Sequence, residues 1–389
     1  MAVFSIETAK PLMSFFLRVP QTHSSFRNPD SSSCWNVTRV FLAAFAAFAQ
    51  VATAETTTTS ENPAHAAELS NFQNPAAMMG VESCRDCHDS HVEAWENTKH
   101  ATSFSNLHER ELAQSIASLL EVQPLEIRQE ASCSRCHFTE EKIHGVIQIE
   151  QAVSCESCHG AGESWIDVHN NGSLSRQFRV LQSSKAGMAH PDNVHDMGKR
   201  CYDCHVIDSE ALVNIAGHPA TSEGFEFYSW SQGEMKHNFM YEKEGRKTKR
   251  NGKNPVEIPQ SRARKLFLAG KLLHLSATLN AIAKSQDPPT DVEGNYVKLP
   301  DGKYTFAVQH ALKARELAEE IRKLQKIVPN KCYAKVIGIM ESLQLETGNT
   351  EAIQEAAGMV DDVAEHFCLD ATGAEYPALD QILAKLEMR

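Results

Sequence analysis

One short pattern, C-x-x-C-H, occurs four times in this sequence and constrains the structure more than any other feature. The cysteine pairs are Cys84 with Cys87, Cys133 with Cys136, Cys155 with Cys158, and Cys201 with Cys204. The histidines that follow them directly are His88, His137, His159 and His205. Because the 389 residues hold only 11 cysteines and 18 histidines, chance alone predicts far fewer than one such pattern.

The spacing of this pattern suits covalent attachment of haem. Two thiols three residues apart reach two vinyl groups on one edge of a porphyrin, and the adjacent histidine turns under the ring to ligate iron. Zinc ribbons also use C-x-x-C pairs, but zinc does not require a histidine after every second cysteine. The sequence therefore predicts four haem c groups, each with one axial histidine from its own motif.

Helix geometry restricts the second axial ligands. His100 follows His88 by twelve residues, which is ~18 Å along a helix, so it ligates another haem or none. The same reasoning applies to His169, which is ~15 Å along a helix from His159. His91 lies on the same helix face as His88, so the two cannot grip opposite sides of one haem.

Two histidines after the fourth motif are candidates for its second ligand. His218 lies in Gly217-His218-Pro219 and His237 precedes Asn238, and either can close the fourth haem, with a narrow preference for His218. Three further histidines lie in loop-like sequence and are predicted to be exposed, namely His144, His190 and His195.

Net charge and the N-terminal sequence indicate an exported acidic protein. A formal charge of -12 argues against a nucleic-acid partner. Arg39 precedes an apolar run at residues 40–48, and Ala52-Thr53-Ala54 resembles a signal-peptide cleavage site. The run is too short to span a membrane, although an uncleaved anchor is the alternative. We expect cleavage near Ala54 and a periplasmic mature chain.

The sequence divides into five parts, and the expected fold is mainly α. The parts are a leader (1–54), a flexible segment (55–80), a tetrahaem domain of short helices and loops (81–241), a basic linker (242–259) and an antiparallel helical bundle (260–389).

The bundle is predicted from apolar residues at helical spacing. Leu268, Leu272, Leu275, Leu279 and Ile282 form one stripe. Further helices are expected over 317–328, before Pro329, over 331–345, after Asn349 and after Pro377.

Two cysteines remain in the predicted bundle. Export favours a disulfide between Cys332 and Cys368, and the alternative is two buried thiols.

Two segments resemble the cytochrome c-554 family of tetrahaem cytochromes. One runs from Cys84 to Phe104 and includes Trp95 and His100, and the other is the run from Val153 to Gly162 followed by His169. The resemblance covers roughly residues 80–240. The chain departs from the family around His218 and His237 and in the sequence after residue 255.

This resemblance implies a set of ligands. It places His169 on the haem of His88 and His100 on the haem of His159. It also implies that the haem of His137 has an open distal side and is five-coordinate.

The expected function is electron transfer through four covalently bound haems, mostly His/His ligated, between redox-partner proteins. The alternative is an oxidoreductase acting on nitric oxide, hydroxylamine or nitrite at an open His137 haem. No catalytic residue is assigned, and His144, Glu140 and Glu141 are the nearest candidates in sequence. The bundle or the basic linker is expected to allow docking to a respiratory complex.

Overall fold

The computed structural model describes residues 74–233, 235, 258–287, 289–291, 293–346 and 348–386. All of them belong to one unit of the chain. The predictions about the leader, its cleavage near Ala54, the flexible segment up to residue 73, the basic linker up to residue 257 and His237 lie outside the described residues.

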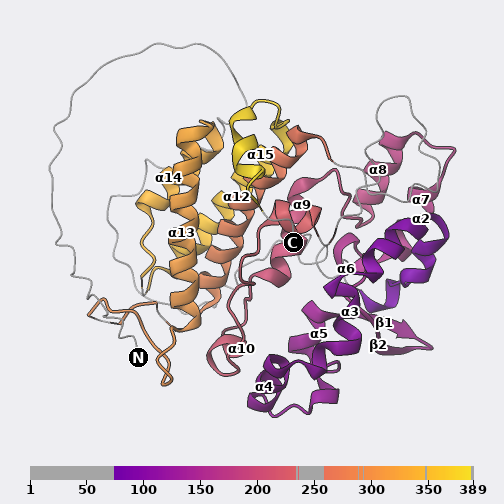
Figure 1. The fold of residues 1–389 in the computed structure, drawn as a ribbon, viewed down its shortest axis with the longest axis horizontal. Helices are drawn as coiled ribbons and strands as arrows, with labels where there is room; N and C mark the ends of the chain where they lie inside the picture. The colour runs from indigo at the N-terminus through magenta and orange to yellow at the C-terminus, as the bar shows by residue number, and fades with distance from the viewer. Residues whose placement is uncertain are drawn as a thin grey trace, which may run out of the picture. The chain divides into compact units, whose positions relative to one another are not determined.

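Short helices make up the part of the chain that carries the four motifs (Figure 1). They are α2 (Val81–Glu96), α3 (Lys99–Asn106), α4 (Glu111–Leu119), α5 (Ala131–His137), α6 (Cys155–His159), α7 (Ile166–Asn170), α8 (Arg176–Lys185), α9 (Val194–His205), α10 (Glu210–Asn214) and α11 (Phe227–Gln232). Single 3-10 turns lie at Pro75–Ala77, Leu107–Glu109, Pro124–Glu126 and Gly162–Ser164. The predicted mainly α class is confirmed.

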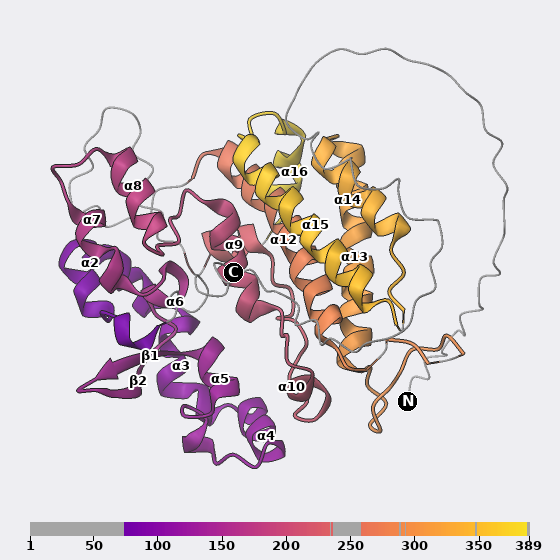
Figure 2. The ribbon, with the colours of Figure 1, turned by 180° about the vertical axis from the view of Figure 1, so that it is seen from behind.

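A β-hairpin interrupts these helices and was not predicted. Strand β1 (Phe138–Ile143) pairs antiparallel with β2 (Val146–Ala152), as Figure 2 shows. The two connecting residues have positive φ, 51° at His144 and 86° at Gly145, which is the backbone of a tight type I′ turn. His144 is therefore exposed at the hairpin tip, as predicted.

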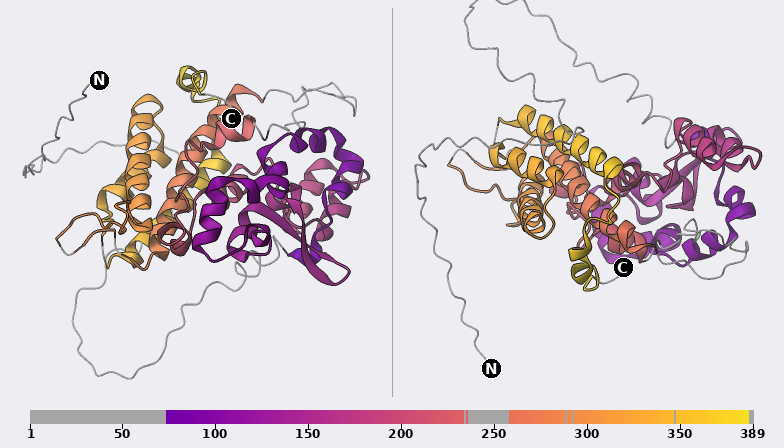
Figure 3. Two further views of the ribbon diagram at one scale, coloured as in Figure 1. Left: turned by 60° about the horizontal axis from the view of Figure 1, so that its bottom comes forward. Right: turned by 90° about the horizontal axis from the view of Figure 1, so that it is seen from above.

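The C-terminal helices lie side by side and bury the predicted apolar stripes (Figure 3). They are α12 (Gln260–Lys284), α13 (Phe306–Ile327), α14 (Lys331–Ser342), α15 (Thr350–Asp370), a 3-10 turn at Pro377–Leu379 and α16 (Asp380–Leu383). Leu268, Leu272, Leu275 and Leu279 have no exposed surface. Buried Ser276 on α12 donates a hydrogen bond of 3.1 Å to the carbonyl of Ala357 on α15.

One of the described helices, α12, is long and apolar enough to cross a membrane. However, 78% of its apolar window is buried inside the structure, as in the core helix of a soluble protein. Its length and composition are therefore weak evidence for a membrane span.

Cys332 and Cys368 form no disulfide with each other, so the expected disulfide is not present. Cys368 is buried and Cys332 is half-buried, so the alternative of two buried thiols holds for Cys368 only. Burial raises the pKa of Cys368 to about 12, which disfavours the thiolate that forms disulfides.

Helix α9, which carries the fourth motif, shares one hydrophobic core with the bundle (Figures 1 and 2). Val194, Tyr202 and Val206 are buried in the same cluster as the leucines of α12. The approach is close: a Cβ on Gly198 would lie 2.4 Å from Leu273 Cδ1. The bundle therefore supports the helix of the fourth motif directly.

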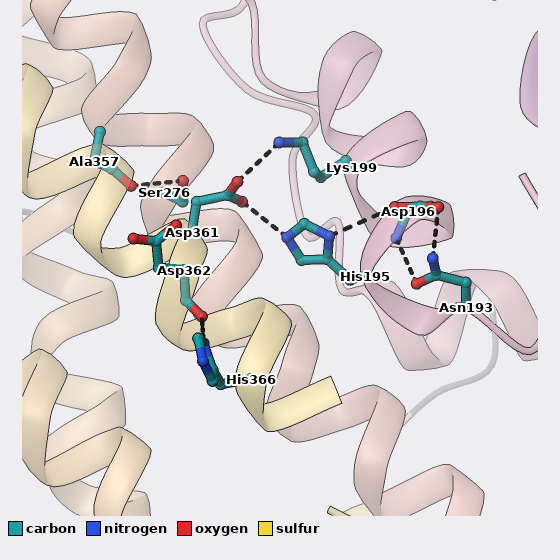
Figure 4. A network of polar contacts seen from close by, with 9 residues as sticks. All are labelled: Asn193, His195, Asp196, Lys199, Ser276, Ala357, Asp361, Asp362 and His366. Carbon is teal, nitrogen blue, oxygen red and sulfur yellow. Dashed lines mark hydrogen bonds and ion pairs between the residues drawn. The ribbon is translucent and has the colours of Figure 1, made fainter. Parts of the chain in front are cut away.

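A polar network also joins α9 to α15 (Figure 4). Nε2 of His195 lies 3.1 Å from Oδ1 of Asp361, and Nζ of Lys199 lies 2.9 Å from its Oδ2. The other ring nitrogen of His195 faces Asp196 at 3.6 Å. His195 is buried, so the prediction that it is exposed is wrong, because the bundle covers it.

This network makes stability depend on pH. Burial lowers the pKa of His195, but hydrogen bonds to Asp196 and Asp361 and the charge of Asp361 outweigh burial and raise the pKa from 6.5 to about 9. Because the pKa of His195 is higher in the folded state, its protonation stabilises the folded protein fully below pH 6.5. This stabilisation is lost as the pH rises through 9. We expect the free energy of unfolding to fall by about 2–3 kcal/mol across that window.

Urea unfolding of the full chain at the two ends of this pH window tests the expectation. Asp361→Asn should flatten the pH dependence, because it removes a hydrogen-bond acceptor and a charge from His195. The exposed neighbour Asp362 provides the control, and Asp362→Asn should keep the wild-type slope. Equal slopes in wild type and Asp361→Asn would contradict the assignment.

Candidate haem sites

All four motifs adopt the same local structure. The cysteine pair lies three residues apart on one helix face, and the histidine marks the point where the regular helix stops. Helices α5, α6 and α9 end at His137, His159 and His205, and α2 kinks at His88 (φ -121°, ψ 37°). Each histidine is thus placed where the chain can turn it beneath a group bound to the two sulfurs.

The first motif faces His169. The rings of His88 and His169 have centroids 6.1 Å apart and an interplanar angle of 32°. Helix α7 holds His169, whose ring packs edge-on against the buried Trp165 at 5.6 Å. The placement of His169 opposite His88 is the one that the family resemblance implied.

The fourth motif faces His100. The ring centroids of His205 and His100 are 6.1 Å apart, with an interplanar angle of 72°. Helix α3 is capped by Thr98, and Ser103 on the same helix donates to the carbonyl of His137 at 2.7 Å. These contacts bring His100 beside His205, whereas the resemblance implied the haem of His159.

The second motif faces His218. The ring centroids of His137 and His218 are 6.4 Å apart, at 53°. Gly217 (φ 72°) turns the chain after α10, and the backbone N–H of His218 donates to the carbonyl of Leu212 at 2.9 Å. The structure thus places His218 beside His137, the motif histidine whose haem was expected to be open, whereas the sequence indicated His218 as a candidate ligand of the fourth haem.

The third motif is held by the segment before α9. Nδ1 of His159 donates to the carbonyl of Ala189 at 2.9 Å, and the N–H of Ala189 donates to the carbonyl of His159 at 3.0 Å. A protonated Nδ1 leaves Nε2 as the ligating nitrogen. The next residue, His190, is buried, so the prediction that it is exposed is wrong.

The separations within the three histidine pairs fit an iron between the rings. An iron–imidazole bond is about 2 Å long, so two rings on opposite sides of one iron have centroids about 6 Å apart. The observed values are 6.1, 6.1 and 6.4 Å. The residues present therefore suit His/His-ligated haem.

The electrostatic surroundings keep these rings neutral. Burial, followed by the neighbouring histidines, lowers the pKa of His137 and of His169 to about 4 and that of His205 to about 3. Neutral imidazole has the free lone pair that binds iron.

The four motifs contact one another in a fixed order. Helix α2 packs against α6, α6 packs against α9, and α9 packs against α5. The order of contact is therefore first, third, fourth and second motif.

Some residues at these sites carry no clear signal in the sequence. Phe225 stacks on His205 with ring centroids 3.9 Å apart, and Ser222 Oγ lies 2.8 Å from its Nδ1. Both follow the fourth motif after α10, in sequence without a periodic pattern.

The motifs and the histidine pairs define a c-type cytochrome built mainly from α-helices. Residues 83–160, which hold the first three motifs, match the family described as cytochrome c554 and c-prime. Over these residues the match confirms the resemblance expected from the sequence, and it agrees with haem c and a haem-based redox function. No curated protein and no solved structure matches the chain.

Proposed function

We propose that this chain transfers electrons through four covalently attached haems in the periplasm. The observation that carries the proposal is the set of histidine pairs whose rings are separated by the width of one iron site. Each bound haem c supplies an iron that exchanges one electron. The continuous contact of the four motifs supports transfer from one to the next.

The residues of the chain suit electron transfer better than chemistry on a substrate. In the three histidine pairs, two histidine ligands would leave no vacant position on the iron. Hydrogen bonds from Nδ1 of His159 to Ala189 and from Nδ1 of His218 to Pro219, at 2.9 and 2.8 Å, hold the rings in one orientation. Such fixed ligands change little between the two oxidation states.

The alternative, a nitrogen-oxide oxidoreductase at the His137 haem, has less support. His218 faces His137 on the side where a substrate would bind. Of the nearby candidate residues, His144 is at the exposed hairpin tip, and Glu140 accepts a hydrogen bond of 2.7 Å from Ser134.

The proposed partners are redox proteins that donate and accept electrons, and the acidic chain is not expected to bind nucleic acid. Docking to a respiratory complex through the bundle would use its outer faces, because α9 already covers part of α12 and α15. The leader sequence supports export before haem attachment.

Haem content and spin state of the oxidised full-length protein test the proposal. We expect four haems per chain by pyridine haemochrome assay. Three motif histidines face a second histidine, so we expect low-spin ferric signals from at least three haems by electron paramagnetic resonance (EPR). High-spin signals from two or more haems per chain would contradict the proposal, because at least one of these pairs would then not ligate its iron.

A further inference from the structure

Glu156 is a fully buried carboxylate inside the third motif. Its residue is 1% exposed. Oε1 accepts hydrogen bonds from the backbone N–H groups of Met79 and Gly162 at 2.9 and 2.6 Å. Oε2 accepts from Gly80 at 2.8 Å and from Met79 at 3.1 Å. One side chain thus binds three backbone amides on two other segments.

The first of these segments leads into the helix of the first motif. Gly80 is the N-cap of α2, has a φ of 78° and offers no side-chain cap. Glu156 places a carboxylate there instead, where the helix dipole favours negative charge. The position of α2, and with it His88, is therefore tied to the third motif.

The second segment leads to the distal ligand of the same haem. Gly162 begins the 3-10 turn Gly162–Ser164, which is followed by Trp165 and by α7 with His169. A Cβ on Gly162 would lie 3.0 Å from both Oε1 of Glu156 and Cγ of Met79, so the three groups are closely packed. The segments that lead to His88 and to His169 are thus hydrogen-bonded to the same carboxylate, that of Glu156.

We propose that Glu156 is a positioning residue that sets the His88–His169 geometry of the first haem relative to the third motif. The inference rests on the proposed function, since it requires haem at both motifs. Helices α2 and α6 pack against each other, so the attachment points of the first and third motifs are adjacent. The carboxylate also places a buried negative charge beside them, and such a charge stabilises ferric iron.

Two substitutions in the full-length holoprotein test the charge and the geometry separately. Glu156→Gln keeps the shape and removes the charge, so the midpoint potentials of two haems should rise. It also weakens the hydrogen bonds from Glu156 to the backbone of Met79, Gly80 and Gly162. The g values of the low-spin EPR signal of the first haem should therefore change, because they depend on the angle between the planes of the two histidine ligands. Gly162→Ala keeps the charge but displaces the carboxylate, so it should change the g values of that haem without raising two potentials.

Glu163→Gln is the matched control. Glu163 is exposed and adjacent to Gly162. This variant removes an equal charge without changing the hydrogen bonds of Glu156, so it should match wild type in both measurements. If Glu156→Gln and Gly162→Ala lower only the free energy of unfolding and keep wild-type potentials and g values, Glu156 is merely structural. If the Glu156→Gln protein does not acquire its haems, the g values of the Gly162→Ala protein alone test the proposal.

Recording wild type first separates the two proposals. A wild-type protein with fewer than four haems, or with fewer than three low-spin haems, contradicts the proposed function. A wild-type protein that meets both conditions, with variants identical to it, contradicts only the role of Glu156.

Discussion

Replacing His218 by alanine should convert one haem in four from low-spin to high-spin. His218 faces His137 across 6.4 Å, and its removal leaves that iron with water or no ligand on the distal side. The expected result is a new high-spin ferric EPR signal that integrates to one haem per chain. Added imidazole should occupy the vacated position and restore the low-spin signal.

A second variant tests whether the two histidines serve different haems. His100→Ala should open the haem of His205, so the double variant should show two more high-spin haems than wild type. If both histidines served the same iron, the double variant would show only one more. His144→Ala, at the exposed hairpin tip, is the control and should keep the wild-type signals. A His218→Ala protein with the wild-type spin states would refute the pairing.

The local features of the fold were predictable because short-range chemistry determines them. The motifs specify haem attachment within five residues, and the stripe from Leu268 to Ile282 defines a buried helix face without knowledge of its partner. The bundle helices end near the predicted positions for the same reason. Val328, for example, caps α13 just before Pro329.

The ligand pairs were less predictable because they depend on how distant segments meet. Helix geometry excluded His100 from the haem of His88, in agreement with the observed pairs, but it gave no choice among the other three motifs. That choice depends on Thr98, Ser103 and the hairpin, which bring α3 to the end of α5. The hairpin was missed because a histidine at the first turn position is an unusual signal for a type I′ turn.

Burial of polar residues was the hardest feature to foresee. His195 is polar and lies close to loop-like sequence, yet helix α15 covers it and supplies Asp361. Glu156 occupies a variable position of the motif, and its role depends on amides more than seventy residues earlier in the chain. Such contacts arise only once the segments are packed.

The largest loss of stability is expected from Tyr202→Ala, because Tyr202 lies where the helix of the fourth motif packs against the bundle. Tyr202 is 3% exposed, stacks on His274 at 4.9 Å and meets the ring of Phe225 edge-on at 5.3 Å. Its hydroxyl donates to the carbonyl of Gly270 at 2.8 Å. Removing a buried aromatic side chain typically lowers the free energy of unfolding by about 3–5 kcal/mol. Urea unfolding followed by circular dichroism measures the change.

Two further variants separate the contribution of side-chain packing to stability from that of the hydrogen bond between Tyr202 and Gly270. Tyr202→Phe keeps the ring and should cost about 1–2 kcal/mol, because the carbonyl of Gly270 loses its buried donor. Tyr304→Ala removes a tyrosine that is 37% exposed and should change stability by no more than about 0.5 kcal/mol.

Haem attachment itself should survive all three substitutions. The residues between the cysteines differ in every motif, so attachment does not require Tyr202, and four haems per chain are expected in each variant. A Tyr202→Ala protein as stable as Tyr304→Ala would mean that α9 does not share its core with the bundle. A large loss of stability with intact haem content would instead show that the C-terminal helices stabilise the segment that carries the four motifs.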